Sequence, residues 1–283
     1  MPPQAARPRR WWGRPSWPIL SQPILSQPIR NNPLSDRWPD GVGRHVLPRT
    51  DSTNAEAIRL AAHLSGPAWV MAHEQSSGRG RRGREWIMPK GNFAGTLLLR
   101  PKAGVAQAAQ LSFVAALALH DVLGAVCGPA ARLAIKWPND VLLNGGKVAG
   151  ILLESAGSGS QIGAVCVGIG VNLAAAPAAA QVEQRAASPV SVLSETGFQV
   201  APEEFLDLLA PAFAGWQAQL ETYGFAPIRN AWLARAARLG ETITARTSNA
   251  EAQGIFEGID ETGALILKTP AGRQVLPAAD VFF

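Results

Sequence analysis

The residues with the clearest chemical potential lie in one short segment, Ser77–Trp86. It places four arginines within six residues, separates them with two glycines, and ends on a tryptophan. Arginine forks bind phosphate bidentately, glycine lets a backbone approach a ligand closely, and tryptophan offers a flat face to a ring. The segment predicts a loop that wraps a nucleotide phosphate. Its composition also fits a flexible basic loop or a nucleic-acid contact, and it is not a Walker A loop because no Gly-Lys-Ser/Thr follows.

Four other polar motifs each have a structural explanation beside a chemical one. Ser52-Thr53-Asn54 has the composition of a helix N-cap, and Asn139-Asp140 that of a turn. Lys147 follows a predicted hairpin turn, where a lysine is normally solvated. Gly168-Ile169-Gly170 fits a strand packed against a closely approaching group. No Cys/His cluster has metal-ligand spacing and no Gly-x-Ser-x-Gly elbow is present.

The order of these motifs along the chain is more specific than any one of them. It resembles the catalytic domain of the biotin protein ligases over roughly residues 45–240, and the last 45 or so residues resemble the family's SH3-like C-terminal domain. The motifs that carry the resemblance are Ser52-Thr53-Asn54, Gln75, Gly78-Arg79-Gly80-Arg81-Arg82-Gly83-Arg84-Glu85-Trp86, Ile135-Lys136-Trp137-Pro138-Asn139-Asp140, Lys147-Val148-Ala149-Gly150-Ile151-Leu152-Leu153-Glu154 and Gly168-Ile169-Gly170-Val171-Asn172-Leu173. Some members also carry an N-terminal DNA-binding domain, which this chain lacks, so sequence-specific DNA binding is not expected.

The resemblance implies a two-step reaction in which ATP activates biotin as biotinyl-adenylate and a lysine of a biotin carboxyl carrier protein accepts the biotin. It implies that Lys147 and Arg81 are catalytic, because they offset the negative charge that develops at the reacting carboxylate and phosphate. Residues implied to bind biotin or the adenylate are Ser52, Thr53, Asn54 and Gln75 at the ureido ring, and Arg79, Gly80 and Arg81 at the carboxylate and phosphate.

A second group of residues is implied in supporting roles. Trp86 packs against the ligand or anchors the loop, and Asp140 positions the acceptor lysine or magnesium. Asn139, Gly150 and Asn172 belong to the motifs that surround the site. Magnesium is expected to travel with ATP, since the sequence shows no dedicated metal cage.

These residues must be positioned by an α+β catalytic domain, expected over residues 44–239. The predicted architecture is a mixed, largely antiparallel sheet flanked by helices, like that of class II synthetases and biotin ligases. Predicted strands cover residues 67–74, 93–99, 132–137, 141–143, 147–154 and 162–172. The first predicted helix begins at Thr53, with Glu56 completing a capping box. Further predicted helices cover residues 106–123, 191–196, 202–222 (kinked or divided at Pro211) and 227–239.

The two ends of the chain differ from this domain. Residues 240–283 predict a small SH3-like β-barrel with strands at 242–246, 252–259, 264–269 and 273–277. A module of this size is not expected to be stable alone, so it should dock on the catalytic domain. Residues 1–43 are rich in Pro, Arg and Trp without helical or strand period, which predicts a disordered extension or a mis-assigned start. No apolar stretch follows Arg9 and Arg10, so this segment is not a signal peptide.

Charge and composition exclude other classes. The net charge is +5, but residues 1–44 hold seven arginines against two aspartates, while the remaining 239 residues hold 19 basic and 19 acidic side chains. A neutral folded part argues against a nucleic-acid-binding protein. No apolar run reaches the roughly 18 residues of a membrane span, and two distant cysteines fit buried thiols of a cytoplasmic protein.

A lipoate protein ligase or octanoyltransferase of the same fold is the nearest alternative. The Arg-rich loop (residues 77–86) and the Lys-Trp-Pro-Asn-Asp motif argue against it.

Overall fold

A computed structural model describes residues 37–100, 105–156, 163–181, 183, 185, 187–248 and 250–283. The predicted extension up to residue 36 and the predicted turn at 157–160 lie outside these residues. Residues 37–43, also predicted to belong to the extension, instead form part of the folded domain. The Trp38 indole donates a hydrogen bond to the Val42 carbonyl at 2.7 Å, and the Arg44 guanidinium lies 5.1 Å from the Trp38 ring centroid. The folded domain therefore begins before the expected boundary at residue 44.

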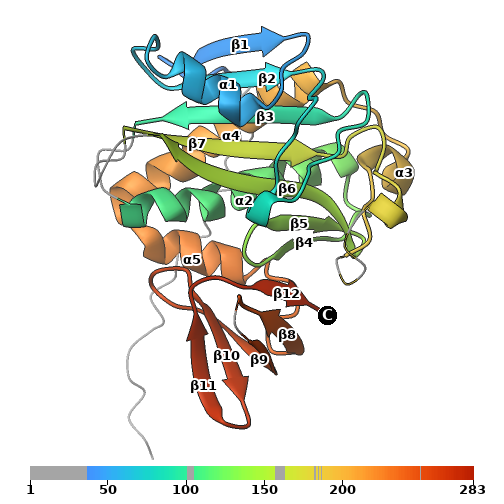
Figure 1. Cartoon of the computed structure of the whole chain (residues 1–283), viewed down its shortest axis with the longest axis vertical. Coiled ribbons are helices and arrows are strands. Elements are labelled where there is room, and N and C mark those ends of the chain that lie inside the picture. Colours follow the sequence, from blue (N-terminus) through green and yellow to red (C-terminus); the bar gives the residue numbers. More distant parts are fainter. Residues whose placement is uncertain are drawn as a thin grey trace, which may run out of the picture. The chain divides into compact units, whose positions relative to one another are not determined.

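Seven strands form one mixed sheet in the order β1-β2-β3-β7-β6-β5-β4 (Figure 1). They are β1 (Gly43–Leu47), β2 (Ala68–Ala72), β3 (Phe93–Leu99), β4 (Leu133–Lys136), β5 (Asp140–Leu143), β6 (Gly146–Ala156) and β7 (Ala164–Val171). β1 runs parallel to β2, and every other neighbouring pair is antiparallel. The predicted mixed, largely antiparallel sheet is confirmed, with β1 as an additional edge strand.

Helices cover both faces of this sheet, with α1 on one face and α2, α4 and α5 on the other (Figure 1). They are α1 (Thr53–Leu60), α2 (Val105–Cys127), α3 (Val192–Thr196), α4 (Pro202–Tyr223) and α5 (Phe225–Leu233). The alternation of β3 assigns its side chains to the two faces: Leu97 and Leu99 join the large core, whereas Leu98 joins a smaller cluster under α1. Thr96 pairs with Gly168 across β3 and β7, so both lie on the α1 face, where the small and polar positions gather.

The α2 helix forms the centre of the large core. Its residues 114–119 have no exposed surface, and it packs against the sheet, α4 and α5. The segment Ala108–Cys127 is long and apolar enough to cross a membrane by length and composition alone, with a mean hydropathy of 1.6. The prediction that no run reaches this length is therefore wrong. Burial of its central turns in the large core accounts for the apolar composition of this helix.

The C-terminal sheet is antiparallel, with the order β11-β10-β9-β8-β12. Its strands are β8 (Thr242–Arg246), β9 (Glu251–Ile259), β10 (Leu265–Thr269), β11 (Gly272–Leu276) and β12 (Asp280–Phe282). The sequence pattern predicts the first four but not β12. The sheet docks on the catalytic domain as expected: the Trp137 indole donates to the Gly263 carbonyl at 2.9 Å, and the Trp232 and Phe256 ring centroids lie 6.5 Å apart.

The capping box predicted for α1 is wrong, and of the two alternatives predicted at Pro211 in α4, a kink or a division, the division does not occur. The capping box does not form at α1, because the Thr53 hydroxyl turns toward Gln75 and Glu56 accepts a 2.8 Å hydrogen bond from Arg59 Nε. In α4, Pro211 lies inside one continuous helix and does not divide it.

The α5 helix ends at Leu233, six residues before the predicted end at Leu239. The chain leaves the helix to pair with the outer edge of β4. Ile135 donates its N–H to the Arg235 carbonyl and accepts a hydrogen bond from the Ala237 N–H, both at 2.8 Å. Tertiary pairing thus overrides the local helical pattern and covers one edge of the large sheet.

Candidate active site

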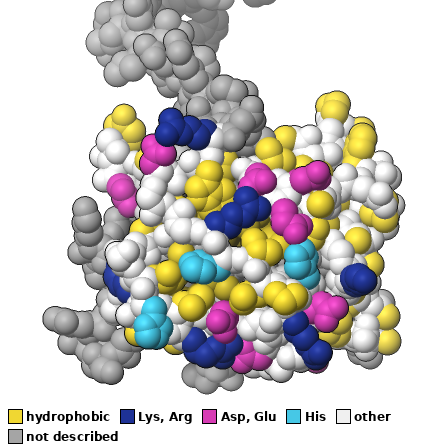
Figure 2. All heavy atoms as spheres, turned by 90° about the horizontal axis from the view of Figure 1, so that it is seen from above, with side chains coloured by type: hydrophobic (Ala, Val, Ile, Leu, Met, Phe, Trp, Pro, Cys, Tyr) yellow, Lys and Arg dark blue, Asp and Glu magenta, His cyan; other side chains and the backbone are white. Residues whose placement is uncertain are grey.

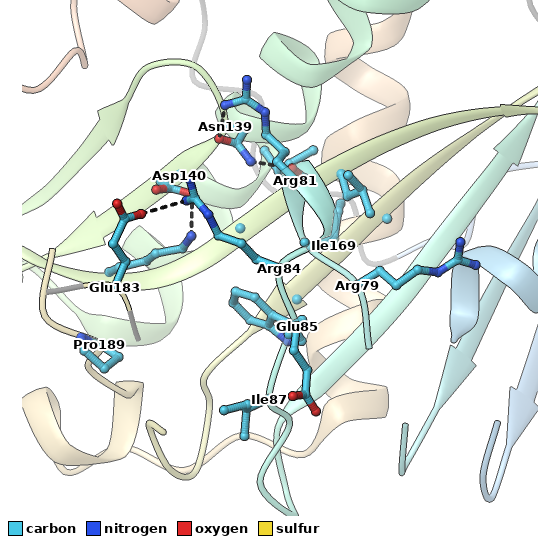
Figure 3. A pocket seen from close by; sticks show the side chains of 18 of the residues that line it. Arg79, Arg81, Arg84, Glu85, Ile87, Asn139, Asp140, Ile169, Glu183 and Pro189 are labelled. Carbon is cyan, nitrogen blue, oxygen red and sulfur yellow. Dashed lines mark hydrogen bonds and ion pairs between the residues drawn. The ribbon is translucent and has the colours of Figure 1, made fainter. Parts of the chain in front are cut away.

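One pocket on the α1 face encloses about 610 Å³, a volume typical of small-molecule sites. The Arg-rich loop, the start of α1, strands β5 to β7 and strand β12 all contribute to its wall. Figure 3 shows part of this wall, with side chains of the Arg-rich loop beside Asn139, Asp140 and Ile169. All thirteen residues singled out from the sequence line it: Ser52, Thr53, Asn54, Gln75, Arg79, Gly80, Arg81, Trp86, Asn139, Asp140, Lys147, Gly150 and Asn172. The fold thus gathers them into one cavity, while their individual roles stay predictions.

A row of four cross-strand neighbours forms part of the pocket wall. The register pairs Lys136 with Asp140, Asp140 with Gly150, and Gly150 with Gly170. Direct neighbours in antiparallel strands project from the same face, so the row presents two charged side chains and two glycines. A Cβ at Gly170 would overlap the Trp86 indole, and one at Gly150 would lie 3.1 Å from it. The glycines therefore allow Trp86 to lie directly on the sheet and anchor the loop.

A buried polar cluster lies at the start of α1. The Thr53 N–H and hydroxyl donate to Gln75 Oε1 at 2.9 and 3.2 Å. Thr96 Oγ1 lies 2.8 Å from Thr53 Oγ1 and 2.6 Å from Asn54 Oδ1. The neighbouring Ser52 is buried as well. Because these groups hold one another in place, the cluster presents polar atoms to the pocket in fixed positions.

Glu154 secures this cluster from β6. Its two carboxylate oxygens accept hydrogen bonds from Asn54 Nδ2 at 2.7 Å and from an Arg79 guanidinium nitrogen at 3.1 Å. A Cβ at Gly168 would overlap the Asn54 side chain, so this glycine is also required for close approach. Figure 3 shows Arg79 pointing away from Arg81. In this structure Arg79 therefore supports the polar cluster rather than joining the other loop arginines.

Lys147 is paired rather than solvated. Its Nζ lies 2.7 Å from Asp140 Oδ1 and 5.6 Å from the centroid of the Trp86 ring. The Lys147 side chain is 28% exposed and that of Asp140 is 16% exposed. The ammonium is thus held within the pocket, beside both the indole and the row of cross-strand neighbours.

Arg81 lines the pocket beside the turn between β4 and β5. One guanidinium nitrogen donates to Asn139 Oδ1 at 3.4 Å, and Asn139 Nδ2 donates to the Ile151 carbonyl at 2.7 Å (Figure 3). Burial lowers the pKa of Arg81, and the charges of Asp280 and Asp140 act in the opposite direction. An anionic ligand would offset the cost of burying this charge.

Asp280, the first residue of β12, holds the Arg-rich loop. Its carboxylate lies 2.7 Å from Arg82, forms an ion pair with Arg84, and lies 4.0 Å from Arg81. Burial raises the pKa of Asp280, but the hydrogen bond from Arg84 and the three arginine charges outweigh burial, so the net shift is downward. The C-terminal domain thus contributes an anionic anchor to the active-site loop.

Asn172 organises a different part of the wall. It is buried, its Nδ2 donates to the Val190 carbonyl at 3.0 Å, and its N–H donates to the Val148 carbonyl at 2.8 Å. Pro189, beside this contact, lines the pocket. Asn172 therefore ties the segment around Val190 to the sheet.

Sequence reasoning missed several charged pocket residues. Lys136 lies within the Lys-Trp-Pro-Asn-Asp motif, so a signal for it existed. Asp280 and Glu183 also line the pocket, but no local pattern marks them. Asp280 bonds to Arg84 across 196 positions of sequence, and only the folded chain reveals such a contact.

The surface on the β1 side has a balanced charge. Figure 2 shows acidic and basic side chains interspersed on this face, and pairs such as Arg44 with Asp207 at 2.5 Å and His73 with Glu203 at 3.0 Å contribute to it. Within the described residues on this face, no continuous basic field is visible. The arrangement gives no support to the nucleic-acid alternative.

Comparison with known proteins identifies the relatives of this fold and site. Residues 46–172 match the Biotin/lipoate A/B protein ligase family, and residues 239–283 match the Biotin protein ligase C terminal domain. A biotin–[acetyl-CoA-carboxylase] ligase of Paracoccus denitrificans is 76% identical over 84% of this chain and 99% of its own length. The bifunctional ligase/repressor BirA of Bacillus subtilis is 32% identical over 85% of this chain and 74% of its own length. The structure of the biotin protein ligase from Aquifex aeolicus in complex with biotin and ATP has a TM-score of 0.71 at 24% identity, covering 84% of this chain and 97% of that one.

The fold and the pocket thus define a ligase of the biotin/lipoate class, with a mixed sheet, a polar cluster at α1 and an Arg-rich loop. Within that class the chain belongs to the biotin protein ligase family, as both its 76% identical relative and its SH3-like C-terminal domain show. These findings favour the biotin ligases over the lipoate alternative.

Proposed function

We propose that this protein activates biotin with ATP as biotinyl-5′-AMP and then transfers the biotin to a specific lysine of a biotin carboxyl carrier protein. The observation that carries the proposal is the single pocket shared by a preorganised polar cluster at α1 and by cations from the Arg-rich loop and β6. The cluster suits the polar ureido ring of biotin, and the cations suit a carboxylate and phosphates.

In the first step, a biotin carboxylate oxygen attacks the α-phosphorus of ATP. The bond from that phosphorus to the bridging oxygen breaks, and the electron pair leaves with pyrophosphate. Such transfers depend on positioning and on neutralising charge. We assign the neutralisation to Lys147 and Arg81, because both cations line the same pocket.

The binding roles follow the position of each group. Ser52, Thr53, Asn54 and Gln75 are assigned to the ureido ring, and Gly80 to the loop segment that covers the activated carboxylate. Arg79 supports the ring site through its 3.1 Å contact with Glu154. A loop that covers the mixed anhydride also protects it from hydrolysis.

In the second step, the neutral amine of the carrier lysine attacks the biotinyl carbonyl carbon. The carbon–oxygen bond to AMP breaks, AMP leaves with the electron pair, and the amine loses a proton to solvent. Asp140 lies 2.7 Å from Lys147 Nζ. We assign it to holding the Lys147 ammonium in place and to orienting the amine of the carrier lysine.

Magnesium is proposed to enter as a complex with the ATP phosphates, where it would further neutralise their charge. Among the described residues, no group of three or more His, Cys, Asp and Glu side chains could hold a metal ion.

A cytoplasmic location fits the same proposal. Both cysteines are buried and not in a disulfide, and burial raises the pKa of each thiol to about 11. Inert, reduced thiols and the use of ATP are typical of that compartment.

The test is direct. The protein is incubated with ATP, magnesium, a carrier domain and equal concentrations of biotin and lipoate, and the carrier is analysed by mass. We expect the carrier to gain one biotin at a single lysine. Addition of lipoate instead, or no addition under conditions in which a known biotin protein ligase works, would overturn the proposal.

A further inference from the structure

Lys136 differs from the other cations of the pocket. Each of the others has a carboxylate within 4.0 Å: Arg79, Arg81, Arg84, Lys147 and Arg246. Among the described residues, Lys136 has no such partner, although it is only 7% exposed. A buried ammonium without a counter-ion is costly, so its place in the pocket wall calls for an explanation.

Two rings of the C-terminal segment lie near this ammonium. Lys136 Nζ lies 5.0 Å from the Phe283 ring centroid and 6.0 Å from that of Phe282. Aromatic faces compensate a buried cation only in part. Burial lowers the pKa of Lys136, and the nearby Asp140 offsets this effect incompletely. A ligand anion entering the pocket would supply the missing charge.

The position of Lys136 in the sheet indicates which anion. The polar cluster lies at α1, which packs on β2, β3 and β7, while Lys147 lies on β6 and Lys136 on β4, at the far end of the cross-strand row. An extended ligand with its ring at α1 and its reacting carboxylate at Lys147 would bring the α-phosphate to the middle of the row. The remaining phosphates would then extend toward β4.

We propose that Lys136 binds the β- and γ-phosphates of ATP and stabilises pyrophosphate as it leaves, an assignment that rests on the function proposed above. When the bond from the α-phosphorus to the bridging oxygen breaks, negative charge grows on that oxygen and spreads into pyrophosphate. The Lys136 ammonium donates hydrogen bonds to this group without a proton being transferred.

This role belongs to the first half-reaction only. Pyrophosphate has left before the carrier lysine attacks, so transfer from preformed biotinyl-5′-AMP does not use Lys136. A purely structural lysine would affect both half-reactions together, because the two steps share one pocket.

Lys136→Met tests the assignment, since methionine keeps the length of the side chain and suits the neighbouring rings. Lys136→Gln serves as a second neutral variant should the first fail to fold, and Lys268→Met controls for the loss of an exposed lysine that does not line the pocket. Thermal unfolding first shows which variants fold. Single-turnover adenylate formation, transfer from synthetic biotinyl-5′-AMP, and calorimetric binding of inorganic pyrophosphate and of adenosine are then measured.

We expect the folded Lys136 variant to lose adenylate formation by about 100-fold and pyrophosphate affinity by about tenfold or more, with transfer and adenosine binding close to wild type. Pyrophosphate binding within about twofold of wild type, or an equal loss in both half-reactions, would overturn the assignment. Failure of the wild-type protein to form adenylate at all would instead reject the proposed function.

Discussion

The neighbouring carboxylate of Asp140 distinguishes Lys147 from a solvated surface lysine. A solvated lysine beside a hairpin turn contributes little, but Lys147 lies 2.7 Å from Asp140 and faces Trp86. The carboxylate restricts where the ammonium can lie, and the indole limits solvent access from one side. In the reaction proposed above, such a cation would stabilise developing negative charge without first having to be oriented.

Replacing Lys147 with Ala should therefore slow adenylate formation by about 10²–10³-fold, as measured in a single turnover. The change also leaves the half-buried Asp140 without its cation, so the free energy of unfolding should fall by about 1–2 kcal/mol. Lys147→Arg should restore little activity, because a planar fork does not reproduce a compact ammonium.

Lys90→Ala provides the matched control, since Lys90 is exposed and does not line the pocket. It should change stability by less than about 0.5 kcal/mol and leave the rate unaltered. If Lys147→Ala formed adenylate within about threefold of the wild-type rate, Lys147 would be no more than a partner for Asp140.

At the scale of elements, the Arg-rich loop depends on a strand far from it in sequence. Trp86 lies on Gly170 of β7, and Asp280 of β12 binds Arg82 and Arg84. The loop thus has one apolar anchor on the sheet and one ionic anchor on the C-terminal domain. The second anchor gives that domain a part in organising the active site.

Asp280→Asn should loosen the loop, because the amide keeps the shape of the side chain but loses its charge. We expect faster proteolysis within residues 79–84 and a loss of about 1–2 kcal/mol of stability, since the arginines are partly exposed. Asp207→Asn, which removes a comparatively exposed partner of Arg44, should have a much smaller effect. Equal cleavage of wild type and Asp280→Asn would show that Trp86 alone anchors the loop.

The same contact predicts a pH dependence. The pKa of Asp280 is lowered below its ordinary value of 3.8 in the folded protein, so its stabilising contribution is present above that value and is lost as the pH falls through the lowered pKa. The stability difference between wild type and Asp280→Asn should be constant from about pH 8 to 5 and shrink below about pH 4. A difference that grew toward acid would contradict this assignment.

Sequence patterns predicted the elements whose signals are local. β3 (Phe93–Leu99) and β8 (Thr242–Arg246) have the predicted bounds, since each is a clear apolar or alternating run between turn residues. β12 has only three residues, and β1 begins with Gly43, Arg44 and His45, so neither shows a clear apolar run. The early end of α5 depends on pairing with β4, which no local pattern encodes.

The residues of the site also separate into those with a local sequence signal and those that depend on tertiary contacts. Motif residues such as Arg81 and Asn139 could be predicted because neighbours in sequence remain neighbours in one loop or turn. Asp280 and Glu183 could not, because their contacts with the loop arginines exist only after distant segments have come together. The pairing of Arg79 with Glu154 was equally hidden.

At the scale of the whole molecule, the excess positive charge and the catalytic chemistry lie in different parts of the chain. Residues 1–44 carry the +5 charge, whereas the rest of the chain is neutral. The folded domain nevertheless reaches into this segment, since Trp38 and Val42 pack against its large core. The functional boundary should therefore fall before Trp38 rather than at residue 44.

Two truncations separate these possibilities. Removing residues 2–36 should leave the ligation rate and the unfolding midpoint close to those of the full chain, because every residue assigned to the reaction lies beyond position 51. Removing residues 2–42 also deletes Trp38 and Val42, whose partly buried side chains should contribute about 1–3 kcal/mol to the free energy of unfolding. Urea denaturation and carrier biotinylation, measured on both proteins, test the boundary. If removing residues 2–36 lowered the rate by more than about tenfold, roughly 1.4 kcal/mol in the barrier, the basic segment would take part in catalysis or carrier binding. If the two truncations were equally stable, the boundary of the folded domain would lie at residue 43 instead.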